Sequence, residues 1–189
     1  MRLWLIRHFE PEVASGICYG QTDLNLRHPI DGNADHLMRL KNQLIKLGAA
    51  HAPIISSPLR RCAQIATWLN SSAKFDDRLR ELHFGDWEMQ TWDVIGASSL
   101  DAWANDLAGF RPPGGETGHE LQKRALDWLR DTAEAHESAI VVTHAGVMRV
   151  LEAHHQRLPG AQWLDLRYDY GQVLALEWSS EQISAAPVQ

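Results

Sequence analysis

Short, almost wholly apolar stretches recur along the chain, and each breaks off at polar residues. The first, residues 3–6, is followed directly by Arg7 and His8. An apolar run of this length is typical of a strand that is buried on both faces of a sheet. The same pattern predicts further strands around residues 53–56, at residues 139–142 and at residues 173–178.

Between these runs, apolar residues recur at the spacing of a helix. Residues 37–47 carry leucines every three or four positions, and the pattern stops at Gly48, a residue suited to a helix end. Ser57 as N-cap and Pro58 at the first helical position predict a helix over residues 59–69. Two more helices are predicted at residues 117–136 and 145–155.

Strands that alternate with helices predict an α/β domain whose largely parallel central sheet is covered on both sides. The chain of 189 residues fits one such domain, 1–189. Residues 76–110 are rich in Trp and acidic side chains, and we expect turns and short helices there, outside the sheet. We also expect a small lid-like region at about residues 83–115, which ends near a Pro-Pro-Gly-Gly loop.

Composition and charge narrow the possible partners. A net charge of −6 and a pI near 5.9 argue against a broad surface for nucleic acid or an anionic membrane. The apolar run at the N-terminus is too short for a signal peptide or a membrane span. Cys18 and Cys62 lack metal-type spacing and are expected to be reduced thiols, which predicts a cytoplasmic location. No feature of the sequence indicates an oligomeric state.

The ends of the predicted strands carry the candidate chemistry. Ligands of parallel α/β sheets bind beyond the carboxyl ends of the strands. Arg7 and Arg61 would offer permanently charged, planar donors that match phosphate oxygens, and Ser57 would add a donor beside them. The sequence therefore predicts a local basic pocket for a phosphate dianion, carried by a small phosphorylated metabolite.

Two histidines and one glutamate complete a possible phosphoryl-transfer site. His8 would attack phosphorus as a neutral imidazole, since the neighbouring arginines disfavour a further positive charge on it. His144 would donate to the phosphoryl group. An alkoxide leaves poorly unless it is protonated, and Glu81 is the candidate general acid, with Glu88 as a nearby competitor.

Other phosphatase chemistries find little support in the chain. A Cys-x5-Arg loop and a Gly-x4-Gly-Lys-Ser/Thr phosphate loop are both absent from the sequence. The nearest candidate for a metal site, Gly118-His119-Glu120, lies in a predicted helix without evident partner ligands. We therefore expect no metal.

The motifs, taken in order, resemble those of the histidine phosphatase superfamily, which includes cofactor-dependent phosphoglycerate mutases. The resemblance covers nearly the whole chain and implies a three-layer α/β/α sandwich, no cofactor, and Gly20 and Gln21 as further substrate-binding residues. Pro11, residues 16–20 and residues 23–26 most resemble those of α-ribazole phosphatases, which remove a phosphate from a corrinoid nucleotide precursor in cobalamin biosynthesis. The matching motifs are Leu5-Ile6-Arg7-His8, Ser57-Pro58-Leu59-Arg60-Arg61, Glu81-Leu82-His83-Phe84-Gly85 and Thr143-His144-Ala145-Gly146.

One departure from the family pattern leaves three functions open. Phe9 and Pro11 stand where the family usually has Gly and Thr, which would place a bulky ring beside the nucleophile and remove donors. The first hypothesis is a phosphomonoester hydrolase, favoured because the chain has no long insertion. The alternatives are a mutase that moves phosphate within a small acid, and a binding module without catalysis.

Most of the remaining histidines and tryptophans are predicted to be structural. Trp87 and Trp92, which follow Glu81, are the two tryptophans expected to touch substrate, while the others would pack in the core or lid. His83 is a candidate for the pocket entrance. We expect the other histidines to lie on the surface, namely His28, His36, His51, His119, His136, His154 and His155.

Overall fold

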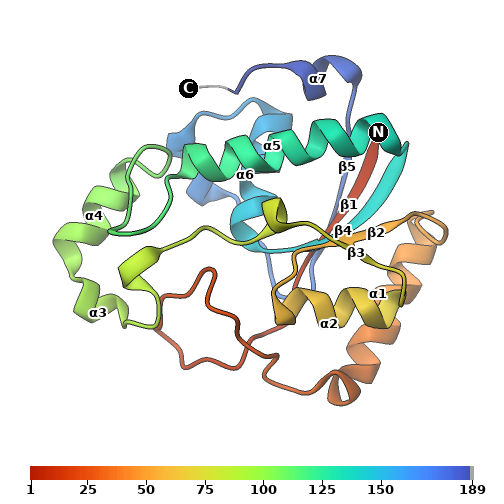
Figure 1. Ribbon diagram of the computed structural model, residues 1–189, viewed down its shortest axis with the longest axis horizontal. Helices are drawn as coiled ribbons and strands as arrows, with labels where there is room; N and C mark the ends of the chain where they lie inside the picture. The colour runs from red at the N-terminus through yellow and green to blue at the C-terminus, as the bar shows by residue number, and fades with distance from the viewer. Residues whose placement is uncertain (188–189) are drawn as a thin grey trace.

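A five-stranded sheet runs through the centre of the protein, with helices on both of its faces (Figure 1). The structure is a computed structural model and describes residues 1–187. The strand order is β3-β2-β4-β1-β5, and every neighbouring pair is parallel except β1 with β5, which is antiparallel. The strands are β1 Arg2–Arg7, β2 Ile54–Ser56, β3 Lys74–Phe75, β4 Ser138–Thr143 and β5 Val173–Glu177.

Helices and short 3₁₀ turns make up the remaining regular structure. The α-helices are α1 Ala34–Lys46, α2 Arg60–Leu69, α3 Trp92–Ile95, α4 Ala97–Asn105, α5 Gly118–Ala135, α6 Ala145–Gln156 and α7 Ser180–Ser184. The 3₁₀ helices are η1 Ile30–Asn33, η2 Asp77–Leu79, η3 Gly85–Trp87 and η4 Gly160–Asp165. No helix within residues 1–187 is both long enough and apolar enough to cross a membrane.

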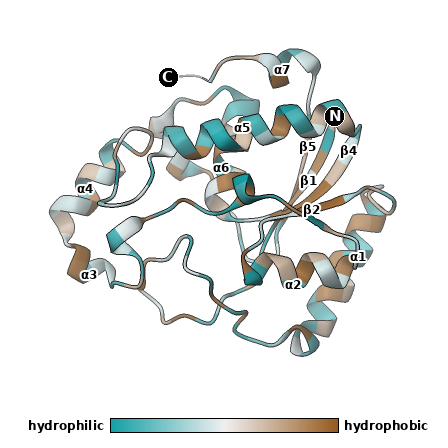
Figure 2. Ribbon diagram, viewed as in Figure 1, coloured by the Kyte–Doolittle hydropathy of each residue, from teal (hydrophilic) through white to brown (hydrophobic). Residues whose placement is uncertain are grey.

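Alternate side chains of β1 are buried on opposite faces of the sheet, which explains its unbroken apolar sequence. Leu3 and Leu5 belong to the cluster that contains the apolar faces of α5 and α6, whereas Trp4 and Ile6 pack with α1 and α2. A strand with period-two side chains needs apolar residues at every position when both faces are covered. The expected three-layer α/β/α architecture is confirmed, and Figure 2 shows its apolar strands between mixed helices.

The structure departs from the predicted elements at a few positions. The sequence did not reveal β3, because Lys74 and Phe75 are exposed residues of a two-residue edge strand. The helix expected from residue 59 begins at Arg60, and its N-cap is Leu59 rather than Ser57. The Ser57 hydroxyl accepts a hydrogen bond from the Leu59 amide at 3.3 Å, and it also lies 2.8 Å from the Nε2 of His144.

The segment between Glu81 and α5 lies outside the sheet, as expected, and its aromatic residues pack against one another. The Trp92 and Trp103 rings are stacked 6.5 Å apart, and Phe84 lies edge-on to Trp103 at 5.7 Å. Gly85 has a φ of 56°, and a Cβ there would come within 2.1 Å of the Pro113 carbonyl oxygen. Residues at the start of this segment therefore pack against residues at its end. The role of the segment as a lid stays a prediction.

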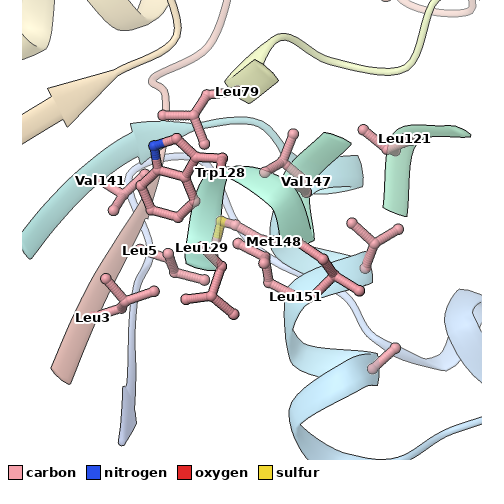
Figure 3. Close-up of a cluster of buried hydrophobic side chains, with 14 of the residues drawn as sticks. Leu3, Leu5, Leu79, Leu121, Trp128, Leu129, Val141, Val147, Met148 and Leu151 are labelled. Carbon is pink, nitrogen blue, oxygen red and sulfur yellow. The ribbon is translucent and has the colours of Figure 1, made fainter. Parts of the chain in front are cut away.

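Trp128 of α5 offers a test of the core, because it is 1% exposed at the centre of the cluster in Figure 3. Replacing it by alanine removes a large apolar side chain and leaves a cavity, which should cost about 3–5 kcal/mol of unfolding free energy. Urea denaturation of Trp128→Ala would measure this loss. The matched control is Trp68→Ala, at a site 37% exposed. An equal loss of unfolding free energy in both variants would contradict the placement of Trp128 in the core.

Candidate active site

Three neighbouring strands end side by side at one edge of the sheet and bring three polar side chains together. Beyond the last residues of β1 and β2, the His8 amide donates to the Thr143 carbonyl at 3.0 Å and the Ser57 amide donates to the Val142 carbonyl at 3.0 Å. These bonds extend the sheet ladder by one residue on either side of β4. His8, Ser57 and His144 are therefore held by the sheet itself rather than by mobile loops.

The ring of His8 has a defined orientation. Its Nδ1 lies 2.6 Å from the Phe9 carbonyl oxygen, and its Nε2 accepts from the Arg61 Nε at 3.3 Å. A carbonyl oxygen can only accept a hydrogen bond, so Nδ1 carries the proton and Nε2 presents its lone pair. The side chain is 2% exposed. The nitrogen that is able to act as a nucleophile therefore faces the guanidinium group.

Burial and nearby positive charge keep this imidazole neutral. Burial lowers the pKa of His8 well below its ordinary value, and the positive charge of Arg61 lowers it further, with a smaller contribution from Arg7. The hydrogen bond to the Phe9 carbonyl acts in the opposite direction but does not outweigh them. The sequence-based expectation of a neutral His8 thus has a direct physical cause in the structure.

Arg61 is fully buried, and backbone carbonyls accept from its guanidinium group. One terminal nitrogen donates to the Thr22 carbonyl at 2.9 Å and the other to the Gly20 carbonyl at 2.5 Å. Gly20 is required at its position, because a Cβ there would lie 1.9 Å from the Leu82 carbonyl oxygen. The loop at residues 20–22 therefore fixes Arg61 in place without neutralising its charge.

Arg7, at the end of β1, supplies a second positive charge beside His8. It donates to the Tyr168 carbonyl at 2.6 Å, and its Cζ lies 3.9 Å from the centre of the Tyr170 ring. Within residues 1–187, neither Arg7 nor Arg61 forms an ion pair with a carboxylate. Buried cations without counter-charges are costly unless an anion binds. The site therefore carries positive charge that no described carboxylate offsets by an ion pair.

His144 lies against both His8 and Ser57. The two imidazole centroids are 5.1 Å apart at an interplanar angle of 64°, and the His144 Nε2 lies 2.8 Å from the Ser57 hydroxyl. Burial lowers the pKa of His144 well below its ordinary value, and Arg61 and then His8 lower it further. The thiol of Cys62 lies 3.5 Å from the same Nε2, and burial raises its pKa, so it packs as a neutral group.

The side chain of Glu81 lies against the first turn of α6, the helix that follows His144. One carboxylate oxygen accepts from the Leu82 amide at 2.9 Å, and the other accepts from the Gly146 amide at 3.1 Å. A Cβ on Gly146 would lie 2.1 Å from the first of these oxygens. The absence of a side chain at Gly146 therefore makes room for the carboxylate.

Glu88, the competing glutamate, holds the loop instead. Its carboxylate accepts from the amides of Gln21 at 2.9 Å, Thr22 at 2.6 Å and Phe84 at 3.1 Å, and from the Thr22 hydroxyl. Burial alone would raise the pKa of Glu88, but these hydrogen bonds outweigh it and hold the pKa below its usual value. A carboxylate fixed in its ionised form by four donors is poorly suited to donate a proton, which favours Glu81.

Two tyrosines that the sequence analysis did not single out close over the site. The hydroxyls of Tyr19 and Tyr170 are 2.9 Å apart, and the Arg61 Cζ lies 5.5 Å from the Tyr19 ring centre. Tyr19 belongs to the stretch 16–20 that was noted for its family resemblance. No pattern in the sequence pointed to Tyr170, because it reaches the site only through the turn before β5, where the Gly171 amide donates to the Arg7 carbonyl.

Several side chains expected near the substrate lie elsewhere. Gln21 donates its side-chain amide to the Glu81 carbonyl at 3.1 Å, so it braces the backbone of the site. The ring of Phe9 is not beside the nucleophile, because it packs in the core cluster with α1 and lies 6.0 Å from His36. Trp87 is 6% exposed and stacked on Phe110, and therefore offers no free face to a ligand.

Among the histidines expected on the surface, His154 is buried. It is 4% exposed, its Nε2 lies 2.9 Å from the Gln182 carbonyl oxygen, and its ring stacks on Trp178. It lies in the last turn of α6, which α7 covers, and that packing could not be anticipated from the local sequence. His83, the candidate for the pocket entrance, is half-buried.

The described residues contain no group of three or more His, Cys, Asp and Glu side chains able to hold a metal ion. Glu120, in the segment considered for a metal, instead forms a capping box with Thr117 and an ion pair with Arg111 at 2.6 Å. The neighbouring His119 lies edge-on to Trp163 at 6.5 Å. The local structure thus gives both residues other partners.

The two neutral histidines should make the protein sensitive to mild acid. In the unfolded chain both titrate near pH 6.5, whereas in the folded protein burial holds both pKa values well below this. The unfolded chain then binds more protons, so the free energy of unfolding falls as pH drops below about 6.5, by about 1 kcal/mol or more for each histidine at pH 5.5.

Urea denaturation between about pH 7.5 and pH 5.5 would measure this slope. Replacing His8 and His144 together by asparagine should make it shallower, and His154, whose pKa burial also lowers, should account for part of the slope that remains. The exposed His28→Asn should leave it unchanged. An unaltered slope in the double variant would show that other groups cause the acid sensitivity.

Comparison with known proteins agrees with this geometry. The profile of the histidine phosphatase superfamily (branch 1) matches residues 3–187. The chain is 28% identical over 184 residues to the adenosylcobalamin/alpha-ribazole phosphatase of Salmonella typhimurium, covering 90% of this chain and 87% of the relative. It is also 28% identical over 169 residues to the glucosyl-3-phosphoglycerate phosphatase of Mycobacterium tuberculosis, covering 77% and 75%.

Solved structures extend the likeness to three dimensions. Bacillus stearothermophilus YhfR superposes with a TM-score of 0.80 at 27% identity, covering 95% of this chain and 92% of that one. A mycobacterial glucosyl-3-phosphoglycerate phosphatase in complex with VO3 superposes with a TM-score of 0.78 at 26% identity, covering 93% and 92%. The chain therefore belongs to the histidine phosphatase superfamily (branch 1), and it is a phosphatase.

Proposed function

We propose that the protein hydrolyses phosphomonoesters of small metabolites through a phosphohistidine at His8. The observation that carries this proposal is the orientation of the His8 lone pair toward Arg61, in a site whose two arginines form no ion pair with a carboxylate of residues 1–187. A bound phosphate would supply the missing negative charge. The arginines would then stabilise the charge on the equatorial oxygens during transfer.

In the first half-reaction the Nε2 of His8 attacks phosphorus, and the bond from phosphorus to the ester oxygen breaks. Glu81, entering as the carboxylic acid, gives its proton to that oxygen so that an alcohol leaves. The ring now carries positive charge, and the hydrogen bond from Nδ1 to the Phe9 carbonyl stabilises it. His144 and Ser57 would donate to the oxygens of the transferring group.

The second half-reaction regenerates the enzyme. Glu81, now a carboxylate, takes a proton from a water molecule, whose oxygen attacks phosphorus while the phosphorus–nitrogen bond breaks. Inorganic phosphate leaves and His8 is again neutral. The hydrogen bonds that Glu81 accepts from the Leu82 and Gly146 amides hold its carboxylate in one place for both proton transfers.

The substrate itself is a finer part of the proposal. The resemblance of residues 16–20 and 23–26 and the Salmonella relative suggest an α-ribazole 5′-phosphate of cobalamin biosynthesis, and the mycobacterial relative suggests a phosphoglycerate derivative. Cys18 and Cys62 are buried free thiols, which suits the proposed cytoplasmic location. A substrate panel that includes both compounds would separate them.

Replacing His8 by alanine should abolish hydrolysis of p-nitrophenyl phosphate, because the attacking nitrogen is lost. The measurements are the rate of p-nitrophenol release and the acid-labile phosphate bound to the enzyme after a rapid quench. His28→Ala, at an exposed histidine, should keep both signals, and a chelator should change neither. Full activity in His8→Ala would rule out the mechanism.

Gly146→Ala should separate leaving-group protonation from the rest of the reaction. The new Cβ would displace the Glu81 carboxylate, so kcat/KM for an alkyl phosphate, which reports phosphorylation of His8, should fall by about 10²-fold or more. The kcat/KM for p-nitrophenyl phosphate should fall far less, because p-nitrophenolate leaves without a proton. The control is Gly32→Ala, where a Cβ meets nothing closer than 3.8 Å. Equal losses on both substrates would argue against Glu81 as the acid.

A further inference from the structure

A cavity of about 90 Å³ adjoins Glu81 on the side of α4, α5, α6 and η4. Its walls are mainly apolar and aromatic, and one cationic side chain, Arg149, lines it together with Glu81. The apolar lining comes from Phe84, Trp103, Leu107, Leu121, Val150 and Trp163. No step proposed above uses Arg149, so this charge among apolar walls calls for an explanation.

Arg149 has few partners for its charge. Its Nε and one terminal nitrogen share a single acceptor, the Leu166 carbonyl, at 3.3 and 3.2 Å. Within residues 1–187, its other terminal nitrogen has no hydrogen-bond partner, and no carboxylate lies within ion-pair distance of the group. Burial lowers the pKa of Arg149 from its ordinary value, and the negative charge of Glu81, which lines the same cavity, only partly offsets this cost.

Two other partly buried arginines are neutralised. Arg124 donates to the Glu116 carboxylate at 2.5 Å and to the carbonyls of Arg78, Arg80 and Glu81. Arg78 pairs with Asp76 at 2.8 Å and with Asp131 at 2.6 Å. Arg149 therefore resembles Arg7 and Arg61 of the candidate site more than these two, and a cation left unpaired in an apolar cavity is typical of a ligand-binding group.

The position of Glu81 indicates which ligand would enter. The oxygen that Glu81 protonates is bonded to the first carbon of the leaving group, so that carbon must lie next to the Glu81 carboxylate. From there the leaving group can extend into the cavity that Glu81 lines. Arg149 comes one helical turn after Gly146, which binds Glu81, so both residues face the same side of α6.

We infer that this cavity binds the leaving group of the substrate, and that this group is a short apolar chain ending in a carboxylate that pairs with Arg149. The inference rests on the proposed function, because it uses Glu81 as the general acid. Size limits the group, since cavities of about 150 Å³ are known to hold one benzene molecule and this one is smaller. Such a pocket favours an acidic leaving group over a neutral ribazole nucleoside.

Two matched substrates test this specificity, the phosphate monoesters of ω-hydroxybutanoate and ω-hydroxybutanamide. They have the same length and differ in the charge of the terminal group. A charge-assisted hydrogen bond to Arg149 should give the carboxylate ester a kcat/KM about tenfold or more above that of the amide ester. Equal values would overturn the inference.

Variants at position 149 connect the preference to this residue. Arg149→Met should remove most of the ratio between the two esters, and Arg149→Lys should restore part of it. Arg130→Met changes an arginine of α5 that pairs with Asp127, and it should keep the full ratio. A ratio unaltered in Arg149→Met would contradict the assignment. If Arg149→Met proves unfolded by its thermal transition, Arg149→Lys and the wild-type ratio decide the question.

The same assay keeps the two proposals apart. Release of p-nitrophenol by the wild-type protein without any preference between the esters would overturn the leaving-group pocket and leave the hydrolase standing. A complete lack of hydrolysis on every substrate would refute the proposed function. A higher kcat/KM for an α-ribazole 5′-phosphate than for the carboxylate ester, unaffected by Arg149→Met, would assign the cavity to a neutral group.

Discussion

Two guanidinium groups held beside one neutral imidazole, without an ion-pair partner in the part of the chain that the structure describes, are the constraint on which the rest of this site depends. Burial, together with the charges of Arg61 and Arg7, keeps a proton off the Nε2 of His8, and the same charges would attract an anion to the place that this nitrogen faces. One electrostatic arrangement thus serves binding and nucleophilicity together. It does so in a protein whose net charge is −6, because local burial matters more here than total charge.

Backbone carbonyls make this arrangement tolerable in the folded state. Gly20, Thr22 and Tyr168 accept hydrogen bonds from the two arginines and orient them, but a neutral carbonyl does not cancel a positive charge. The nearby carboxylate of Glu88 is occupied instead with the amides of the loop that carries two of these carbonyls. The Glu88 carboxylate therefore fixes the loop that orients Arg61, while Arg61 itself bonds to neutral carbonyls of that loop.

Glu81 lies between the two halves of the proposed site. Its carboxylate accepts from the Gly146 amide, two residues after His144, and it also lines the apolar cavity with Arg149. A single carboxylate between a basic, polar region and an apolar region is well placed to protonate the oxygen that joins phosphate to an apolar leaving group. Gly146 provides the space for this carboxylate, since any side chain at that position would collide with it.

Local sequence patterns determined the layers of the fold and the strand ends that hold His8, Ser57 and His144, because an apolar strand and an amphipathic helix are encoded by neighbouring residues. Features that depend on contacts between distant segments were decided only by the tertiary structure. Tyr170 meets Tyr19, Phe9 turns into the core, His154 is covered by α7, and the edge strand β3 forms. The different hydrogen-bond partners of Glu81 and Glu88, and the single carbonyl that accepts from Arg149 among the described residues, also depend on contacts between distant segments. In each case the role depends on which donors and charges lie within a few ångströms in space, and a residue's neighbours in sequence do not specify those.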